Sequence, residues 1–236
     1  MKKKIGISVA VILTFALIAG AMIYFLAIRP KRMEQQAHLQ AVERYRADKT
    51  AVYMQENDRY GDYEVDVAFL GDSLTDGYDV AAAYPQFLVC NRGIGGDTTF
   101  DLEGRLQIGV YDLKPKVAVV LIGANNLDSM FDNYENILVG LQQNLPETKV
   151  VLLSLTCMGG DHWGKGNAQA AYNNVKIKKM AEQYGFSFVD LYSPLMDLQT
   201  GEIYPAYTTD GGHLTAQGYE VLTAQITPVL EALLAQ

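Results

Sequence analysis

Five residues spread along the chain have the types needed for acyl transfer, and the first of them is Ser73. It stands in Gly71-Asp72-Ser73-Leu74, directly after a short apolar run. A serine placed at the end of a buried strand is exposed above the sheet and close to a helix N-terminus, whose amides favour a developing negative charge. Thr75 occupies the position of the second glycine in the G-x-S-x-G elbow of α/β-hydrolases. The missing glycine disfavours that class and leaves Ser73 as a candidate nucleophile.

A base for this serine must come from three histidines, His38, His162 and His213. His38 lies in a polar, helix-forming stretch, whereas His213 follows Asp210 at a spacing of three. An aspartate at that distance can reach back to the imidazole, fix its tautomer and stabilise the imidazolium formed during acyl transfer. By itself, Asp-x-x-His is more often an ordinary surface turn.

The remaining requirement is a set of donors for an oxyanion. Gly96 can offer a backbone N–H where a side chain would crowd a substrate, and Asn125 can offer its amide. Both can also be plain turn residues. A dinucleotide-binding fingerprint starting at Gly93 is excluded, because its third glycine would fall on Thr98 and the segment follows the second strand rather than the first.

A parallel sheet would bring these residues together. Five apolar runs lack the alternation of half-exposed strands, as expected when both faces are buried, and helical stretches lie between them. The runs are residues 65–70, 87–90, 117–122, 150–155 and 186–191, and the helical stretches are 99–113, 133–145, 167–184 and 215–234. They predict a three-layer α/β/α domain over residues 61–236 with a five-stranded parallel sheet. The strand order typical of this fold class is 2-1-3-4-5. Ligands bind at the carboxyl ends of such strands, where the candidate residues lie.

The first 60 residues have a different character. Residues 5–28 carry no charge and would form a helix of about 36 Å, which exceeds a bilayer core of about 30 Å. A cleaved signal peptide has an apolar region of only about 7–15 residues, so residues 1–32 are interpreted as a cytoplasmic tip and an uncleaved transmembrane anchor, with a cleaved signal as the alternative. The basic cluster at residues 2–4 favours a catalytic domain outside the cytoplasm. Residues 33–60 predict a helical stalk.

Composition excludes several partners. The chain carries 19 basic and 27 acidic residues, and beyond residue 32 only 13 basic residues oppose all 27 acidic ones. A body this acidic repels phosphate backbones, which argues against a nucleic-acid partner. Two cysteines exclude a disulfide framework. Cys90 lies near the end of the second strand and Cys157 just after the fourth, and these strands are not neighbours in the order typical of this fold class, so we expect two buried free thiols. No cluster with metal-ligand spacing occurs, so no metal is expected.

Taken in order, four segments resemble the sequence blocks of the SGNH hydrolases, also called the GDSL family. The resemblance covers about residues 65–225. The segments are Gly71-Asp72-Ser73-Leu74, residues 91–98, Gly123-Ala124-Asn125-Asn126 and Asp210-Gly211-Gly212-His213. The third block usually ends in Asp, so Asn126 is a departure that leaves open which asparagine points inward. The catalytic subunits of the acetylhydrolases that act on platelet-activating factor are similar in this block and in the second.

The resemblance implies a serine esterase that works through an acyl-enzyme, without a cofactor. Ser73 would be the nucleophile, His213 the base and Asp210 its partner. The amides of Ser73 and Gly96, with the side chain of Asn125, would form the oxyanion hole. A lipid esterase or lysophospholipase, an acyltransferase with the same site, and a surface binding protein with a silent hydrolase fold remain alternatives.

The substrate is expected to meet the loop of residues 158–166, which carries four glycines, His162 and the only tryptophan, Trp163. An aromatic face with flexible neighbours suits a sugar ring or a short acyl chain, although Trp163 can equally cap the edge of the core. We also assign Asp72, Asn126 and His162 to substrate binding. No long apolar stretch near the site indicates a tunnel, so we expect small acyl groups, acetyl first, on a carbohydrate or other alcohol outside the membrane.

Overall fold

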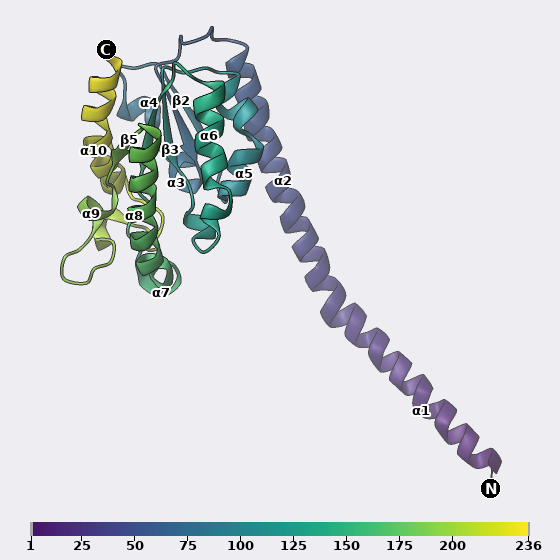
Figure 1. Cartoon of the computed structure of the whole chain (residues 1–236). Helices are drawn as coiled ribbons and strands as arrows, with labels where there is room; N and C mark the ends of the chain where they lie inside the picture. The colour runs from purple at the N-terminus through teal and green to yellow at the C-terminus, as the bar shows by residue number, and fades with distance from the viewer. Residues whose placement is uncertain (1, 236) are drawn as a thin grey trace. The chain divides into compact units, whose positions relative to one another are not determined.

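The computed structural model describes the backbone of residues 2–235 and the side chains of residues 11–17 and 19–235. Its contacts divide the chain into two compact units, Met1–Lys49 and Thr50–Gln236. The elements are labelled in Figure 1.

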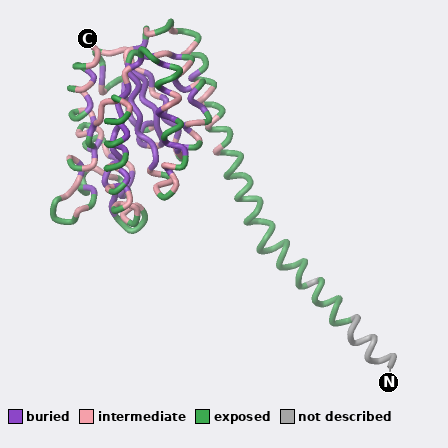
Figure 2. Tube along the Cα trace, viewed as in Figure 1, coloured by how far each residue is buried: buried purple, intermediate pink, exposed green. Residues whose placement is uncertain are grey.

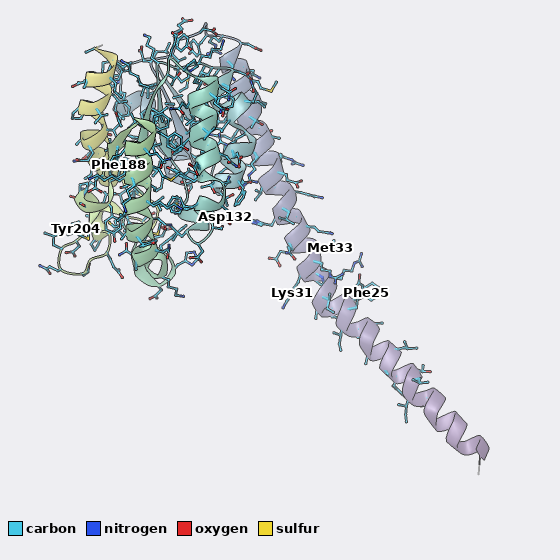
Figure 3. All side chains as sticks on the ribbon, viewed as in Figure 1. Phe25, Lys31, Met33, Asp132, Phe188 and Tyr204 are labelled. Atoms are coloured by element: carbon cyan, nitrogen blue, oxygen red, sulfur yellow. The ribbon has the colours of Figure 1, made fainter. Side chains whose placement is uncertain are left out.

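The first unit is helical. It comprises α1 (Lys2–Ile23), a π-helical turn (Tyr24–Ile28) and the first part of α2 (Arg29–Asn57). The apolar side chains described between Val11 and Met33 are exposed, and Phe25 and Met33 project away from the helix (Figure 3). By length and composition this is one helix apolar enough to cross a membrane, a criterion that a signal sequence also meets. A membrane anchor therefore remains our proposal.

The second unit is built on a parallel sheet in the order β2-β1-β3-β4-β5, which confirms the predicted fold. The strands are β1 (Val67–Gly71), β2 (Val89–Gly93), β3 (Val117–Leu121), β4 (Lys149–Leu153) and β5 (Ser187–Val189). The register places Gly71 beside both Gly93 and Leu121. The first three strands therefore end at one level, and the segments that follow them meet at one edge of the sheet.

Helices cover both faces of this sheet, and the strands are buried between them (Figure 2). Successive strand side chains alternate between two cores: Ala68 and Leu70 face one, Val67 and Phe69 the other. The first core is closed by α5 (Thr99–Gly104), α6 (Tyr134–Asn144) and α8 (Asn167–Tyr184). The second is closed by α3 (Ser73–Asp76), α4 (Val80–Ala83), α9 (Tyr192–Leu195) and α10 (Ala216–Leu234).

The observed elements differ from the expected ones where polar residues are buried. β2 was expected at residues 87–90 but continues to Gly93, because Asn91 donates to the carbonyls of Thr75 and Tyr78, and Arg92 is fully buried. The expected helix 99–113 is interrupted: α5 ends at Gly104, and a π-helical turn (Gln107–Tyr111) follows. The longer β2 thus depends on tertiary contacts of Asn91 that periodicity does not reveal.

The last two turns of α2 belong to the second unit and pack on β2. The Tyr53 hydroxyl donates to the Gly93 carbonyl at 2.7 Å, and the Arg92 guanidinium lies 4.7 Å from the centre of the Tyr53 ring. Arg92 also pairs with Glu56 at 2.9 Å and donates to Asn57 at 3.0 Å. The buried charge of Arg92 is thus paired with Glu56, at the end of a helix that the sequence assigns to a stalk.

Both cysteines are buried free thiols, as expected from the order of the strands. Burial raises the pKa of Cys157 to about 12, so this thiol stays protonated and inert at neutral pH.

Candidate active site

A small pocket lies at the carboxyl edge of the sheet and encloses about 10 Å³. Every strand exit singled out in the sequence contributes to it except the one after β2. Its lining residues are Asp72, Ser73, Leu74, Ala124, Asn125, Thr156, Met158, Trp163, Gly212 and His213. The pocket therefore joins segments that are up to 141 positions apart in the chain, from Asp72 to His213.

Ser73, His213 and Asp210 form a continuous hydrogen-bonded chain at this pocket. Ser73 Oγ lies 3.0 Å from His213 Nε2, and His213 Nδ1 lies 2.7 Å from Asp210 Oδ2. An ionised Asp210 holds the proton of the imidazole on Nδ1, which leaves Nε2 free to accept the serine proton. This geometry suits nucleophilic attack assisted by a general base.

The carboxylate of Asp210 is kept ionised by its local surroundings. Partial burial acts to raise its pKa, but hydrogen bonds from the His213 N–H, the His213 ring and the Gly212 N–H outweigh it and hold the pKa below its usual range. The two backbone donors reach Oδ1 at 2.7 Å and 2.9 Å. Asp210 therefore stays an acceptor at every pH near neutrality.

The position of Ser73 follows from the turn that leaves β1. A side chain at Gly71 would collide with the Leu121 carbonyl and with Thr75, so only glycine allows the strand to pass this close to β3. Asp72 then caps α3 by accepting from the Leu74 N–H at 3.1 Å. Ser73 is the first residue of α3, and its N–H has no partner within the helix.

The two predicted oxyanion donors lie in neighbouring loops. Asn125 lines the pocket, and its Nδ2 donates one proton to the Asp97 carbonyl at 2.9 Å, which leaves the second proton for a ligand. Gly96 has φ +81°, and within residues 2–235 its N–H makes no hydrogen bond. Asn126 instead turns to α5, where it donates to Thr99 Oγ1 at 2.8 Å. Of the two asparagines, Asn125 is the one at the pocket.

Residues 69–221 match the model of the GDSL-like lipase/acylhydrolase family, close to two thirds of the chain. The chain belongs to this family. Membership places it among carboxylic-ester hydrolases.

Known proteins agree with this assignment. The chain is 35% identical over 107 residues to the platelet-activating factor acetylhydrolase IB subunit alpha2 of Homo sapiens, which covers 42% of this chain and 47% of that protein. The match thus spans about half the length of the curated relative. A GDSL-like lipase from Bacteroides thetaiotaomicron is 26% identical, with a TM-score of 0.67 over 78% of this chain and 97% of the other. The acetylxylan esterase Axe2 of Geobacillus stearothermophilus, at 20% identity and a TM-score of 0.59 over 72% and 95%, shares the fold.

Replacing Asn125 with alanine in this GDSL-family protein is expected to lower kcat about 10²- to 10³-fold, because one oxyanion donor is lost. KM for a short aryl ester should change far less. Asn144→Ala is the matched control, since that side chain is exposed, donates to the Gly140 carbonyl of its own helix and does not line the pocket. An Asn125→Ala variant with the wild-type kcat would contradict the assignment.

A buried ion pair that the sequence did not reveal stands behind the oxyanion donors. Arg105 Nε lies 2.6 Å from Asp97 Oδ2, and Arg105 Nη2 donates to the Gly71 carbonyl at 3.0 Å. The pair therefore ties the end of β1 to the loop that carries Gly96. The available signal was a charge between Leu102 and Leu106, on the apolar side of a predicted helix.

Asp72, assigned to substrate binding from the sequence, is only 1% exposed. Burial raises its pKa from 3.8 to about 7; the nearby Asp97 adds to this, while the Leu74 N–H and His213 oppose it. Its carboxyl lines the pocket and caps α3, so little of its surface is left for contact with a substrate.

The shifted pKa of Asp72 makes stability depend on pH. Between about pH 4 and pH 7 the folded protein retains a proton that the unfolded chain releases, so this carboxyl destabilises the fold increasingly as pH rises. Asp72→Asn should therefore stabilise the fold at pH 8, by up to about 4 kcal/mol, and have little effect near pH 4. Urea unfolding at both pH values measures this difference. Asp79→Asn, an exposed N-cap of α4, is the control; a pH-independent difference for Asp72→Asn would refute the prediction.

The loop after β4 forms α7 (Gly160–Trp163) and brings Trp163, but not His162, into the pocket lining. Trp163 is half-buried and also packs against the first core. Its position is therefore compatible both with contact to a substrate and with capping the edge of the core. His162 is exposed, with its ring edge-on to the indole at 5.2 Å.

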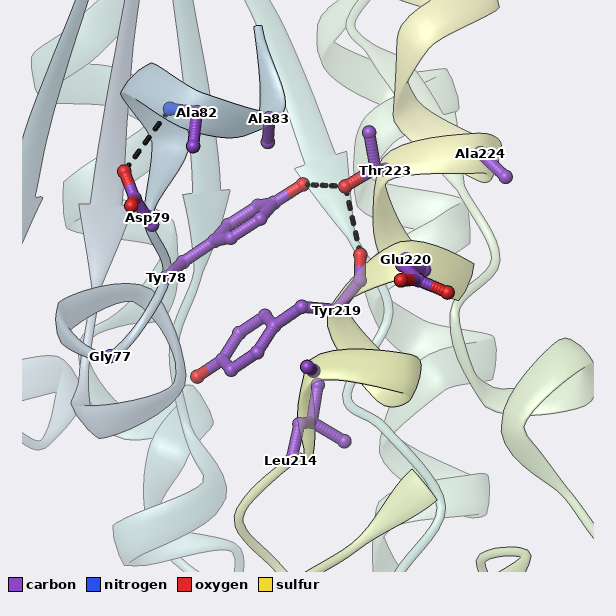
Figure 4. Close-up of a pocket in the computed structure, with 11 residues that line it drawn as sticks. Gly77, Tyr78, Asp79, Ala82, Ala83, Leu214, Tyr219, Glu220, Thr223 and Ala224 are labelled. Atoms are coloured by element: carbon purple, nitrogen blue, oxygen red, sulfur yellow. Dashed lines mark hydrogen bonds between the residues drawn. The ribbon is translucent and has the colours of Figure 1, made fainter. Parts of the chain in front are cut away.

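A second, larger hollow lies between α4 and α10, and Gly77 at the end of α3 lines it as well (Figure 4). It measures about 760 Å³ and shares no lining residue with the catalytic pocket. Tyr78 and Tyr219 stack in its wall with ring centres 5.0 Å apart, and Tyr219 donates to the Leu74 carbonyl at 2.9 Å. Alanine side chains and Leu214 make the rest of this groove mainly apolar. Its lining residues come from two separate segments, residues 77–83 and 214–224, so no continuous apolar stretch in the sequence indicates this groove.

Proposed function

We propose that this protein is a serine esterase that removes short acyl groups, acetyl first, from a carbohydrate or another small alcohol. The observation that carries the proposal is the Ser73–His213–Asp210 chain beside a pocket of about 10 Å³. So little space next to the nucleophile favours the smallest acyl groups. The name of the relative from Homo sapiens, an acetylhydrolase, supports the same class of acyl group.

The proposed reaction passes through an acyl-enzyme. His213 Nε2 accepts the proton of Ser73 Oγ while this oxygen attacks the ester carbonyl carbon. The oxyanion accepts hydrogen bonds from the N–H groups of Ser73 and Gly96 and from Asn125, and Asp210 stabilises the imidazolium. His213 then donates its proton to the leaving alcohol. In the second half, His213 takes a proton from water, which attacks the acyl-serine and releases the acid.

The limit on acyl size is attributed to the pocket's inner wall. Thr156 and Met158 are 1% and 2% exposed, and they belong to the segment that leaves β4. Protein interiors are close-packed, so these side chains do not recede without cost to admit several methylene groups. A two-carbon acyl group requires the least adjustment.

The groove between α4 and α10 favours a second candidate, an ester whose alcohol carries an apolar group. Its volume of about 760 Å³ is sufficient for an alkyl chain or an aromatic ring. Such a substrate would still place a small acyl group on Ser73. Ala224→Trp, which fills this groove from α10, would lower turnover of a long-alkyl acetate alone if the groove holds the alcohol.

The test is a scan of aryl esters with acyl chains of two to twelve carbons, using the full chain in detergent. We expect kcat/KM to be highest for the acetate and to fall by an order of magnitude or more before eight carbons. Each methylene group that does not fit the pocket costs ~1–3 kcal/mol of transition-state binding. A preference for eight carbons or more would replace the proposal with a lipid esterase. Adding an acceptor alcohol, with product analysis, separates hydrolysis from acyl transfer.

A further inference from the structure

The loop that carries Trp163 is joined directly to the turn that carries the catalytic acid and base. The Gly159 N–H donates to the Gly211 carbonyl at 2.9 Å. The other side of the loop is held by Glu202, whose carboxylate accepts from the Gly160 N–H at 3.0 Å, and by Asn167, which accepts from the Met158 N–H at 2.9 Å. α7 is therefore fixed against the segment that precedes α10.

The indole of Trp163 lies on the backbone of Gly212. A side-chain carbon at Gly212 would stand only 2.5 Å from Trp163 Cδ2, so the ring occupies the space that any other residue would need. Gly211 has φ +92°, and a Cβ there would meet the Gly159 carbonyl. The two glycines between Asp210 and His213 are thus explained by the close approach of the α7 loop.

The polar edge of the same indole faces Asp210. Trp163 Nε1 lies 3.4 Å from Asp210 Oδ2, the oxygen that also accepts from His213 Nδ1. Among the residues that the structure describes, the other hydrogen bonds to this carboxylate come from the Asp210–His213 segment itself. The hydrogen bond is long, so packing on Gly212 carries most of the constraint and the N–H adds direction.

The indole also contacts the base. The rings of Trp163 and His213 meet edge to face, with centres 5.6 Å apart and an interplanar angle of 90°. Asp210 and His213 are 46% and 43% exposed, so little else surrounds them. An exposed acid–base pair needs an external support if it is to keep one orientation.

We infer that Trp163 is a positioning residue that holds Asp210 and His213 in the orientation required for proton transfer. This inference rests on the proposed function, in which these two residues act as acid and base. It differs from a substrate-stacking role, because it predicts an effect on turnover rather than on substrate affinity.

The first test compares Trp163→Ala with Trp163→Phe on a short aryl ester. Trp163→Ala should lower kcat about 10- to 100-fold with little change in KM, since a misplaced catalytic pair slows the chemical step. Trp163→Phe keeps the packing on Gly212, loses the N–H, and should retain most of the rate. A raised KM with unchanged kcat in Trp163→Ala would overturn the inference in favour of substrate stacking. Thermal unfolding of each variant separates these effects from misfolding, and Trp163→Phe serves if Trp163→Ala does not fold.

The second test needs no substrate, because Trp163 is the only tryptophan of the chain. A protonated imidazole in contact with an indole quenches its fluorescence, so Trp163 emission should report the protonation of His213. Several ionisable groups face the indole or its loop, and a change in their charge could alter the emission. They are His162 and Asp161 from α7, His213 and Asp210 before α10, Asp72 in the pocket lining, and Glu202 beside Gly159. Burial raises the pKa of Asp72 to about 7, so this carboxyl also changes charge near neutral pH.

The titration is therefore run from pH 5 to 8 on the full chain carrying His162→Gln, which removes the other quencher. We expect emission to rise with pH in this variant and to rise much less in His162→Gln/His213→Gln, where Asp72 still changes charge near the indole. A constant emission in the single variant, or a rise of the same size in both variants, would overturn the contact between Trp163 and the base. If the wild type hydrolyses no ester, the proposed function fails, whereas this titration still decides whether Trp163 contacts His213.

Discussion

Replacing Ser73 with alanine is expected to lower kcat for a short aryl ester about 10⁶-fold. The hydroxyl is the atom on which the acyl-enzyme forms, so its loss removes the covalent route and leaves only the weak effect of the oxyanion donors on attack by water. The side chain is half-exposed and contributes little to the core, so thermal unfolding of the variant should match the wild type.

A matched serine provides the control. Ser193 is exposed on α9, away from the residues that line the pocket, and Ser193→Ala should keep the wild-type rate. Initial rates measured at saturating ester, with the uncatalysed hydrolysis subtracted, give the comparison. If Ser73→Ala keeps more than about one per cent of the wild-type kcat, its activity is far above the expected residual rate, and another group is the nucleophile.

Asp210→Asn is expected to lower kcat about 10⁴-fold and to leave KM nearly unchanged. An amide at this position accepts hydrogen bonds from the two backbone N–H groups, but it lacks the charge that stabilises the imidazolium. It can also present its own N–H to Nδ1, which places the imidazole proton on Nε2 and removes the acceptor for Ser73. The defect is therefore in proton transfer, not in substrate binding.

The pH dependence of this variant supplies a second readout. In the wild type, activity should rise with pH as the imidazole of His213 deprotonates, because only the neutral ring accepts the serine proton. Asp197→Asn is the control, since Asp197 accepts from the Gln199 N–H in a surface turn. A change in KM as large as the change in kcat for Asp210→Asn would indicate a binding role instead.

The sheet and the position of Ser73 could be predicted because they depend on local sequence. Five apolar runs separated by helical stretches specify parallel strands, and the carboxyl ends of such strands meet at one edge. Gly71 permits the sharp exit from β1, so Ser73 is placed by the residues beside it. The spacing of Asp210 and His213 likewise fixes their mutual contact within one turn.

The supporting contacts could not be predicted, because they join segments that are remote in sequence. Arg105 reaches the Gly71 carbonyl across 34 positions, and Trp163 reaches Asp210 across 47. No motif spacing links Arg105 to Gly71 or Trp163 to Asp210, and the sequence does not distinguish a buried arginine from an exposed one. Asp72 is buried and lines the pocket, and no spacing in the sequence marks this burial; its role in substrate binding stays a prediction.

The N-terminal boundary of the second unit, at Thr50, could not be predicted for the same reason. Residues 50–57 continue a polar helical pattern, and nothing local shows that Tyr53 is buried or that Glu56 meets Arg92. Arg92 in turn lies next to Asn91, within a segment quoted for its glycines. A charged residue at the end of a buried strand was the one indication of a partner outside the predicted domain.

The central claim is that Ser73 is a nucleophile activated by His213. Its most direct test is labelling of the full chain with a fluorophosphonate, which reacts covalently with activated serines, followed by mass spectrometry of the peptides. The account predicts a single adduct on the peptide that contains Ser73, no adduct in Ser73→Ala, and much slower labelling in His213→Gln. Labelling of a different serine, or a wild-type protein that stays unlabelled while a known serine esterase in the same tube reacts, would contradict it.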